Sequence, residues 1–210
     1  YQHAAVVLGD IPKSFFSAEQ LAMIRQFVSE RGGGFLMLGG STAFEESFLG
    51  SPIADILPVT LPGQAQLAPQ RRDGTGDDKF SLSLTPEGEH TAILRLGPGG
   101  ADNRQLWQKM PQLQGINVTG PAKPGATVLA VHPTLSLDNE PLPVIAYERY
   151  GRGRSMVITT ASTWRWQMLL PHEDMSHERF WRQVLRWLAA AAPSPLELSF
   201  DKHSYGAGEQ

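Results

Sequence analysis

The first forty residues alternate between short apolar runs and a stretch with helical spacing. Residues 3–10 (HAAVVLGD) form an apolar run that ends in Gly-Asp, as expected of a buried parallel strand. Apolar residues then recur at helical spacing, at Leu21, Ile24, Phe27 and Val28. Residues 35–38 (FLML) form a second buried run, followed by Gly39-Gly40-Ser41. This order of strand, helix and strand predicts a right-handed βαβ unit.

The helix in this unit has start and stop signals of its own. Ser17 and Gln20 have the spacing of a capping box, in which each side chain accepts a hydrogen bond from the other residue's backbone N–H. Phe16 and Leu21 stand at the two positions of a hydrophobic staple. The glycines at 32–34 end the helix. These local signals support the βαβ prediction independently of the hydrophobic pattern.

The carboxyl-terminal part of the chain is the second clearly patterned region. Residues 143–149 and 154–160 are predicted strands, joined by a hairpin over residues 150–153 with glycine at the turn. An amphipathic helix follows, for which Ser176 is a suitable N-cap and Glu178 lies in the first turn. The apolar residues of this helix are Phe180, Val184, Leu185, Trp187 and Leu188.

The middle of the chain has weaker patterns. Residues 65–79 are polar and glycine-rich and predict a loop, whereas residues 80–84 alternate with a period of two, as a half-exposed strand does. The region around Trp107 predicts a short helix or a turn. Further strand candidates are residues 56–61, 92–96, 115–118 and 127–131. The middle is therefore interpreted as a β-rich insertion.

Residues 193–210 differ in pattern from the region before them. Two prolines end the last helix, and Leu196, Leu198 and Phe200 then alternate with polar residues. We expect residues 1–192 to form one α/β domain, and residues 193–210 to be a linker and the start of a following, immunoglobulin-like β domain. Because the chain also begins without Met, we expect it to be a piece of a longer protein.

Composition excludes several classes of function. The 210 residues are 41% hydrophobic and 19% charged, which is ordinary for a globular domain. A net charge of −3 without a long basic run gives no reason to expect nucleic-acid binding. The absence of cysteine excludes disulfides, zinc–thiolate sites and a cysteine nucleophile. No run reaches the roughly 18 apolar residues of a membrane span, so we do not expect the fragment itself to cross a membrane.

Three stretches of the chain carry a resemblance to a known family. They are VVLGDIP with FSAEQLAMIRQFVSERGGGFLMLGG (residues 6–40), SPIADILPV (51–59), and YGRGRSMVITT with HERFWRQVLRWLAAA (150–191). They resemble the class I glutamine amidotransferase-like superfamily, in the branch of the ThuA-like trehalose-utilisation proteins, and most closely the amidotransferase-like domain of large bacterial membrane proteins. The resemblance implies a flavodoxin-like, mostly parallel sheet with helices on both faces. It also implies a parent protein that is membrane-associated through parts outside this fragment.

The resemblance also indicates where a catalytic site would lie. In that superfamily the nucleophile sits on a tight turn after a central strand, where nearby amides can stabilise an oxyanion. Active glutaminases have Cys there and ThuA-like proteins often have His, but in this chain the position falls at Gly39. The partner His follows a strand near the carboxyl terminus, and the matching residues 159–164 (TTASTW) contain none. We therefore expect a non-catalytic interaction or ligand-binding module that uses no cofactor.

Two other groups of residues are alternative candidates for chemistry. Ser41 or Thr42 could replace the missing nucleophile, but a serine needs an adjacent base, and hydroxyls after Gly-Gly more often cap a turn. The second group is His172, Glu173, Asp174 and His177. Its spacing is not that of H-E-x-x-H, so a polar loop before the last helix is the simpler interpretation and no metal site is predicted. A hydrolase of altered chemistry at residues 39–42 or 172–177 remains the alternative function.

A ligand-binding crevice is predicted at the carboxyl edge of the sheet. Its candidate residues are Asp10, Gly39, Gly40, Ser41, Trp164 and Trp166. Arg165, Tyr147 and Arg149 would add to an aromatic and cationic patch suited to a sugar, a peptide or a partner domain, although tryptophans also pack in cores. The expected partners are other domains of the parent protein or a partner in a membrane complex.

Overall fold

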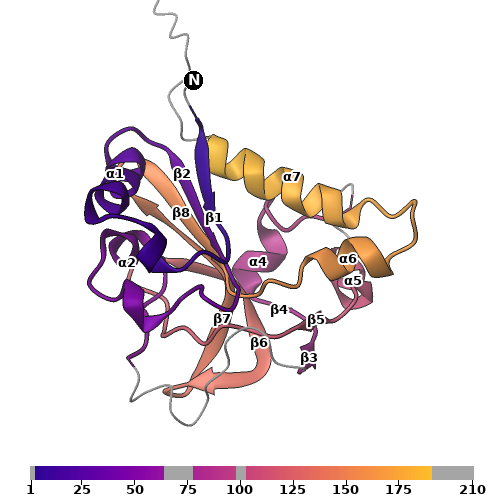
Figure 1. Cartoon of the computed structure of the whole chain (residues 1–210). Helices are drawn as coiled ribbons and strands as arrows, with labels where there is room; N and C mark the ends of the chain where they lie inside the picture. The colour runs from indigo at the N-terminus through magenta and orange to yellow at the C-terminus, as the bar shows by residue number, and fades with distance from the viewer. Residues whose placement is uncertain (1–2, 64–77, 98–102, 191–210) are drawn as a thin grey trace, which may run out of the picture.

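The computed structural model describes residues 3–63, 78–97 and 103–190 (Figure 1). Six strands form one mixed sheet in the order β1-β2-β8-β7-β6-β4. In that order they are β1 (Ala5–Leu8), β2 (Gly34–Leu38), β8 (Gly153–Ile158), β7 (Glu140–Tyr150), β6 (Thr127–Leu137) and β4 (Ser83–Leu84). A separate two-stranded sheet pairs β3 (Lys79–Phe80) with β5 (Leu113–Gln114).

Strand direction divides the six-stranded sheet into two parts. The neighbours β1, β2 and β8 are parallel to one another. The pairs β8–β7, β7–β6 and β6–β4 are antiparallel. The strands β1, β2, β8 and β6 therefore run in one direction, and β7 and β4 run in the other. This mixed sheet, with most of its strands in one direction, confirms the expected α/β class.

The amino-terminal βαβ unit forms as predicted. Between β1 and β2 the chain makes a short 3₁₀ turn (Lys13–Phe15) and then α1 (Ala18–Ser29). The capping box is present: Ser17 Oγ accepts from the Gln20 N–H at 3.3 Å, and Gln20 Oε1 accepts from the Ser17 N–H at 2.9 Å. Gly32 follows the helix with a φ of 76°, which glycine adopts without steric cost.

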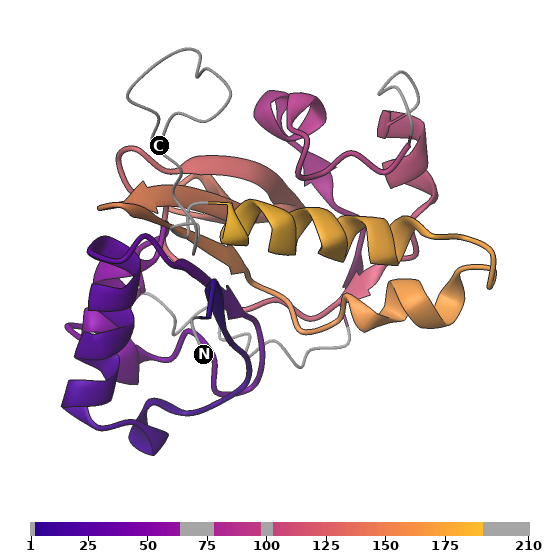
Figure 2. The same ribbon diagram turned by 90° about the horizontal axis from the view of Figure 1, so that it is seen from above.

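Helices cover both faces of the sheet. In β2 the side chains alternate, so that Phe35 and Met37 join the core cluster under α1 and α2 (Pro52–Ile56), whereas Leu36 joins the cluster on the opposite face. That second cluster includes Phe180 and Val184 of α7 (Ser176–Ala189). Figure 2 shows α1 and α7 on different sides of the strands. Burial of both faces explains why the central strands have continuous apolar sequences.

The carboxyl-terminal elements are confirmed with one correction. The hairpin between β7 and β8 forms, and Gly151 at its turn has a φ of 57°. The helix α7 starts near the expected residue, with Glu178 in its first turn. Its N-cap residue, however, is Met175, and Oδ1 of the preceding Asp174 accepts from the Ser176 N–H at 2.8 Å. Ser176 is instead buried within the first turn.

Several strand predictions in the middle of the chain are wrong. Residues 56–61 contain the end of α2 and one isolated bridge, between Val59 and Ala122. The helix forms because Ser51 caps it and a proline follows at a position where helices accept one. Residues 92–96 form bends and turns although Leu94 and Leu96 are fully buried. Their apolar side chains therefore fill the core without belonging to a strand.

Most other middle elements are shifted rather than absent. Residues 80–84 divide between β3 and β4, which belong to different sheets. The strand prediction at 115–118 is wrong: only Asn117 is a bridge residue there, and β5 ends directly before this range. Residues 127–131 fall within β6, and Trp107 lies on a short helix, α5 (Asn103–Lys109), as one of the two interpretations had it. The remaining helices are α4 (Pro86–His90), α6 (Trp164–Leu169) and a second 3₁₀ turn (Glu46–Phe48).

Some predictions fall outside the described residues. They are most of the loop at 65–79 and the whole linker and β-domain segment at 193–210. Among the helices that the structure describes, none has both the length and the apolar character needed to cross a bilayer.

Candidate functional site

The turn after β2 is enclosed by Asp10 on one side and the end of β8 on the other. The Gly39 N–H donates to the Ile158 carbonyl at 2.7 Å. A Cβ added at Gly39 would lie 2.6 Å from backbone atoms of Thr160, and one added at Gly40 would lie 2.4 Å from Cγ of Asp10. Real Cβ atoms essentially never approach other atoms closer than 3.0 Å. Neither glycine therefore has room for a side chain in this arrangement.

Asn117 holds this turn from the buried side. Its Oδ1 accepts from the Gly40 N–H at 3.0 Å, and its Nδ2 donates to the carbonyls of Gly40 at 2.8 Å and Ala43 at 3.2 Å. Its own N–H donates to the Thr159 carbonyl at 2.7 Å, which joins the turn to the end of β8. The sequence analysis missed this residue. A polar amide in the otherwise apolar stretch GINV was the available signal, because a buried amide needs partners.

The carboxylate of Asp10 is bound by the two residues that follow Gly40. Thr42 donates to Oδ1 through its N–H at 2.6 Å and its Oγ1 at 2.7 Å, and Ser41 Oγ donates to Oδ2 at 2.9 Å. Desolvation alone would raise the pKa of Asp10, but the hydrogen bonds from Thr42 and Ser41 outweigh it and lower the pKa from its usual value. An ionised carboxylate that accepts these bonds is a weak base, so Asp10 acts as an anchor for the turn.

A group of buried hydroxyls lies after β8, where the resemblance would place a histidine. Thr160 Oγ1 donates to the Gly115 carbonyl at 2.8 Å and lies 2.8 Å from Ser162 Oγ. Ser162 Oγ accepts from the Gln114 N–H at 2.8 Å. Both hydroxyls are thus engaged with the backbone and with each other. They connect β8 to the segment that carries Asn117.

The structure brings only part of the predicted crevice together. Asp10, Gly39, Gly40 and Ser41 are neighbours, and whether they bind a ligand stays a prediction. Trp166 requires a correction, because it is 1% exposed and its Nε1 donates to the Pro111 carbonyl at 2.9 Å.

The two tryptophans of α6 face different environments. Trp166 packs edge to face against Trp107 and Phe180 in the core, with centroid distances of 5.5 and 5.2 Å. Trp164 is 56% exposed. Residues two positions apart on a helix do not share a face, so one of the pair is buried while the other meets solvent.

Tyr147 and Arg149 do not belong to this edge of the sheet, which is a second correction. The Tyr147 ring packs against Trp187 of α7 with the centroids 4.7 Å apart. Arg149 lies opposite Arg154 at the start of β8 in the strand register, because β7 runs antiparallel to β8. Trp164 follows the other end of β8. The predicted aromatic and cationic patch therefore does not form from these residues.

The segment around His172 and His177 forms a loop and the first turn of α7. His172 is exposed, and the carboxylate of Asp174 accepts from the Ser176 N–H at the start of α7. Desolvation lowers the pKa of His177, so this ring is neutral at neutral pH. Within residues 3–63, 78–97 and 103–190, no three His, Asp or Glu side chains are grouped as a metal site would require.

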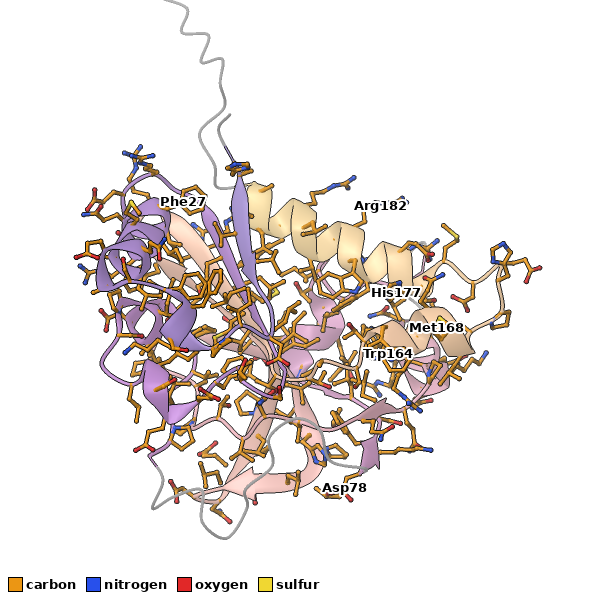
Figure 3. The ribbon with its side chains drawn as sticks, viewed as in Figure 1. Phe27, Asp78, Trp164, Met168, His177 and Arg182 are labelled. Carbon is orange, nitrogen blue, oxygen red and sulfur yellow. The ribbon has the colours of Figure 1, made fainter. Side chains whose placement is uncertain are left out.

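Large apolar side chains are exposed on α6 and the loop after it. They are Trp164 (56% exposed), Met168 (70%), Leu169 (58%) and Met175 (47%), and we call them the α6 surface. Figure 3 shows Trp164 and Met168 near each other on the outside of the domain. The Arg165 guanidinium lies 5.8 Å from the centroid of the Trp164 ring. Clustered apolar exposure of this kind marks interaction sites more often than single exposed residues do.

The fold and the turn after β2 define the class of the protein. A tight turn at the carboxyl edge of parallel strands, with helices on both faces of the sheet, is the arrangement of class I glutamine amidotransferase-like domains. The chain matches the family model GATase1_like, described as "Putative glutamine amidotransferase", over residues 11–190. The chain therefore belongs to that family.

Solved structures with the same fold include two proteins of Salmonella typhimurium. Cytoplasmic protein STM1381 of strain LT2 is 20% identical with a TM-score of 0.59, and cytoplasmic protein STM3548 is 16% identical with a TM-score of 0.58. Each match covers 89% of this chain and 72% of the other. A β-galactosidase from Rahnella sp. R3 is 15% identical with a TM-score of 0.50, over 88% of this chain and 22% of that one. At these identities the likeness is one of fold. No curated protein matches the chain.

Proposed function

We propose that this chain is a non-catalytic class I glutamine amidotransferase-like domain that serves as an interaction module. The observation that carries the proposal is the closed turn at Gly39 and Gly40. A side chain at Gly39 would overlap the backbone of Thr160, so the position of the nucleophile is filled by the fold itself. Loss of activity is then a property of the packing around the turn and not of one substitution.

The other parts of a glutaminase site are also used for structure. Acyl transfer needs a base for the nucleophile and amide donors for the oxyanion, one of them the N–H that follows the nucleophile. That N–H belongs here to Gly40, and it donates to Asn117. The hydroxyls of Thr160 and Ser162 occupy the region of the base and are bound to the backbone. These contacts support the absence of glutaminase chemistry.

One contact favours the alternative, a hydrolase that uses Ser41. Ser41 Oγ lies 2.9 Å from a carboxylate oxygen of Asp10, which is the geometry of a nucleophile and a base. The lowered pKa of Asp10 and its two further hydrogen bonds from Thr42 oppose this role. A carboxylate that is stabilised in its ionised form is a weak base. We therefore interpret the contact as an anchor.

An activity assay separates these two functions. Purified wild-type protein is expected to release no ammonia from glutamine and to hydrolyse no model ester above the rate without protein. Ser41→Ala should give the same result, and Gly39→Cys should destabilise the domain without creating activity, because its Cβ meets Thr160. Hydrolysis by the wild-type protein that disappears in Ser41→Ala would contradict the proposal.

The interaction is assigned to the α6 surface. Its side chains expose apolar area at the edge of the sheet, and such a surface is suited to an apolar segment of another domain or subunit. We propose that the partner is another domain of a longer parent protein, or a subunit of a complex around that protein. The parent would be related to the ThuA-like branch and membrane-associated through parts outside this chain. This part of the proposal rests on the resemblance as well as on the exposed residues.

Oxidative footprinting tests the assigned surface. Met168 is 70% exposed, and Met23 on α1 is 58% exposed, so the two are matched in exposure but lie on different helices. In a longer protein that contains this domain, Met168 should be oxidised more slowly than in the isolated domain, while Met23 should be unchanged. Equal oxidation of Met168 in both proteins would exclude the α6 surface as the interface.

A further inference from the structure

A second carboxylate, that of Glu148, is buried on the face of the sheet that packs against α1 and α2. Glu148 shares this face with Ala146, two residues earlier in β7, whose side chain belongs to the core under these helices. Glu148 is 8% exposed, and within the described part of the chain its Oε1 is buried without a hydrogen-bond partner. Directly opposite on β8 is Ser155, whose buried Oγ also has no partner there. Glu148 thus lies in an environment that suits a neutral carboxyl better than a charge.

The ammonium group of Lys123, whose charge acts on Glu148, is itself bound to backbone carbonyls. Its Nζ donates to the carbonyls of Ala54 at 2.7 Å and Asp55 at 2.9 Å, at the end of α2. Carbonyls at a helix end have no partner within the helix, so an ammonium group there caps α2 and also interacts favourably with its dipole. The charge of Lys123 still acts on Glu148 at longer range.

The remaining charged groups around this face do not neutralise Glu148. Asp55 of α2 and Arg25 of α1 pair with each other at 3.4 Å. Arg149 follows Glu148 in β7 and is exposed, on the other side of the strand. Arg154 of β8 also turns to the opposite face, where its Nη1 donates to the Trp187 carbonyl at 2.8 Å. Among the residues that the structure describes, Lys123 is therefore the cation that acts on an ionised Glu148. The phenol of Tyr150 is another titratable group of β7 packed against this core.

Burial and the charge of Lys123 act in opposite directions on the pKa of Glu148. Burial raises the pKa of Glu148 to about 7, although the charge of Lys123 works in the opposite direction. Burial also lowers the pKa of Lys123. A charge on Glu148 therefore appears within the physiological range, and when it does, Lys123 has two competing sets of acceptors.

We propose that Glu148 and Lys123 form a latch operated by a proton. While Glu148 is protonated, Lys123 stays on the carbonyls of Ala54 and Asp55; when Glu148 ionises, its charge draws the ammonium group away from α2. This is a regulatory property beyond the proposed interaction function and does not depend on it.

The latch would act on the segments that hold α2 in place. Lys123 also pairs through its backbone, where its N–H donates to the Pro58 carbonyl at 2.9 Å, and the Thr60 N–H donates to the Pro121 carbonyl at 3.0 Å. The segment after α2 is thus bound to residues 121–123. Residues 43–51 connect α2 to the turn at Gly40. Release of the helix end would loosen this connection, which Asn117 holds at its other end through the Ala43 carbonyl.

Nuclear magnetic resonance of the wild-type protein across the neutral pH range tests the latch. The carboxyl carbon of Glu148 is expected to titrate near pH 7, and the carbonyl carbons of Ala54 and Asp55 should shift with the same midpoint. In Glu148→Gln these carbonyl signals should stop responding to pH. Glu140→Gln is the matched control, since Glu140 is an exposed glutamate at the other end of the same strand and its loss should change nothing.

Two outcomes would overturn the proposal. One is a Glu148 midpoint at the ordinary value for glutamate, about 4.3. The other is a Glu148 titration near pH 7 while the carbonyl signals of Ala54 and Asp55 stay constant. Lys123→Met keeps the test valid if Glu148→Gln fails to fold: here Glu148 should still titrate, and the helix carbonyls should no longer follow it.

Discussion

Two carboxylates, those of Asp10 and Glu148, lie at opposite ends of the parallel strands, and their pKa values are shifted in opposite directions. Asp10 is exposed but accepts three hydrogen bonds from Ser41 and Thr42, and its pKa is lowered. Glu148 is buried with one oxygen unpartnered, and its pKa is raised to about 7. For Asp10 the hydrogen-bond donors outweigh desolvation, whereas for Glu148 burial without a donor to Oε1 prevails. The carboxylate of Asp10, which accepts hydrogen bonds, fixes a backbone turn. The carboxyl of Glu148, which is buried with an unpartnered oxygen, titrates near neutral pH.

The largest effect is expected at Asn117, which completes the anchored turn. Asn117→Ala removes three side-chain hydrogen bonds and leaves the Gly40 N–H and two carbonyls without partners in a buried place. We expect the free energy of unfolding to fall by about 3 kcal/mol, since each buried unsatisfied group costs about 1–3 kcal/mol. Urea denaturation measures the change. Gln108→Ala, at an exposed residue of α5, is the control and should be near neutral. A loss as small as that of the control would show that the turn does not depend on Asn117.

A smaller effect, of opposite sign, is expected at Glu148. Its folded pKa of about 7 lies above its unfolded value, so the folded state binds more protons between the two, and the free energy of unfolding falls as pH rises through this window. Glu148→Gln should remove this slope and stabilise the protein above pH 7 by about 2 kcal/mol. Denaturation at a series of pH values measures it. If wild type and variant kept parallel stability curves, the carboxyl would not be a neutral-pH group.

Asp10 should show the reverse pH dependence and a smaller magnitude. Because its folded pKa is lowered, its contribution is full above the unfolded pKa of about 3.9 and is lost as pH falls through the folded value. Asp10→Asn should cost about 1 kcal/mol at neutral pH, a modest value because the site is exposed. The same denaturation series in acid checks the sign, with wild type losing its advantage over the variant. If the stability of wild type relative to Asp10→Asn increased in acid, the pKa of Asp10 would not be lowered, and the contrast with Glu148 would be wrong.

The smallest effect is expected at Ser155, the unpartnered neighbour of Glu148. Ser155→Ala removes a buried hydroxyl that has no partner among the described residues, so stability should change by less than about 0.5 kcal/mol or rise slightly. Thermal unfolding at low and high pH measures it. Ser162→Ala, which removes a buried hydroxyl with partners, should cost more and is the matched comparison. Equal losses in the two variants would show that Ser155 has a partner after all.

Short-range signals determined the parts of the fold that the sequence predicted well. The capping box of Ser17 and Gln20 joins residues three positions apart, and the glycine after α1 acts at the helix end itself. The strands β2 and β8 have continuous apolar sequences because helices cover both faces. In the middle, by contrast, short apolar runs such as 92–96 fill the core from turns, and their composition does not distinguish a turn from a strand.

The empty nucleophile position could be predicted from Gly39 alone, but the reason it is closed could not. The sequence by itself determined the βαβ start, the last strand and helix, and the absence of cysteine and of a histidine after β8. Only the tertiary structure decided that Asn117 binds the N–H of Gly40, 77 residues away, and that Trp166 is buried while Trp164 is exposed. It also decided that Glu148 is buried with an oxygen that has no partner among the described residues. The physical reason is range: caps and turns act within a few residues, whereas a hydrogen bond or a burial depends on which distant strands become neighbours.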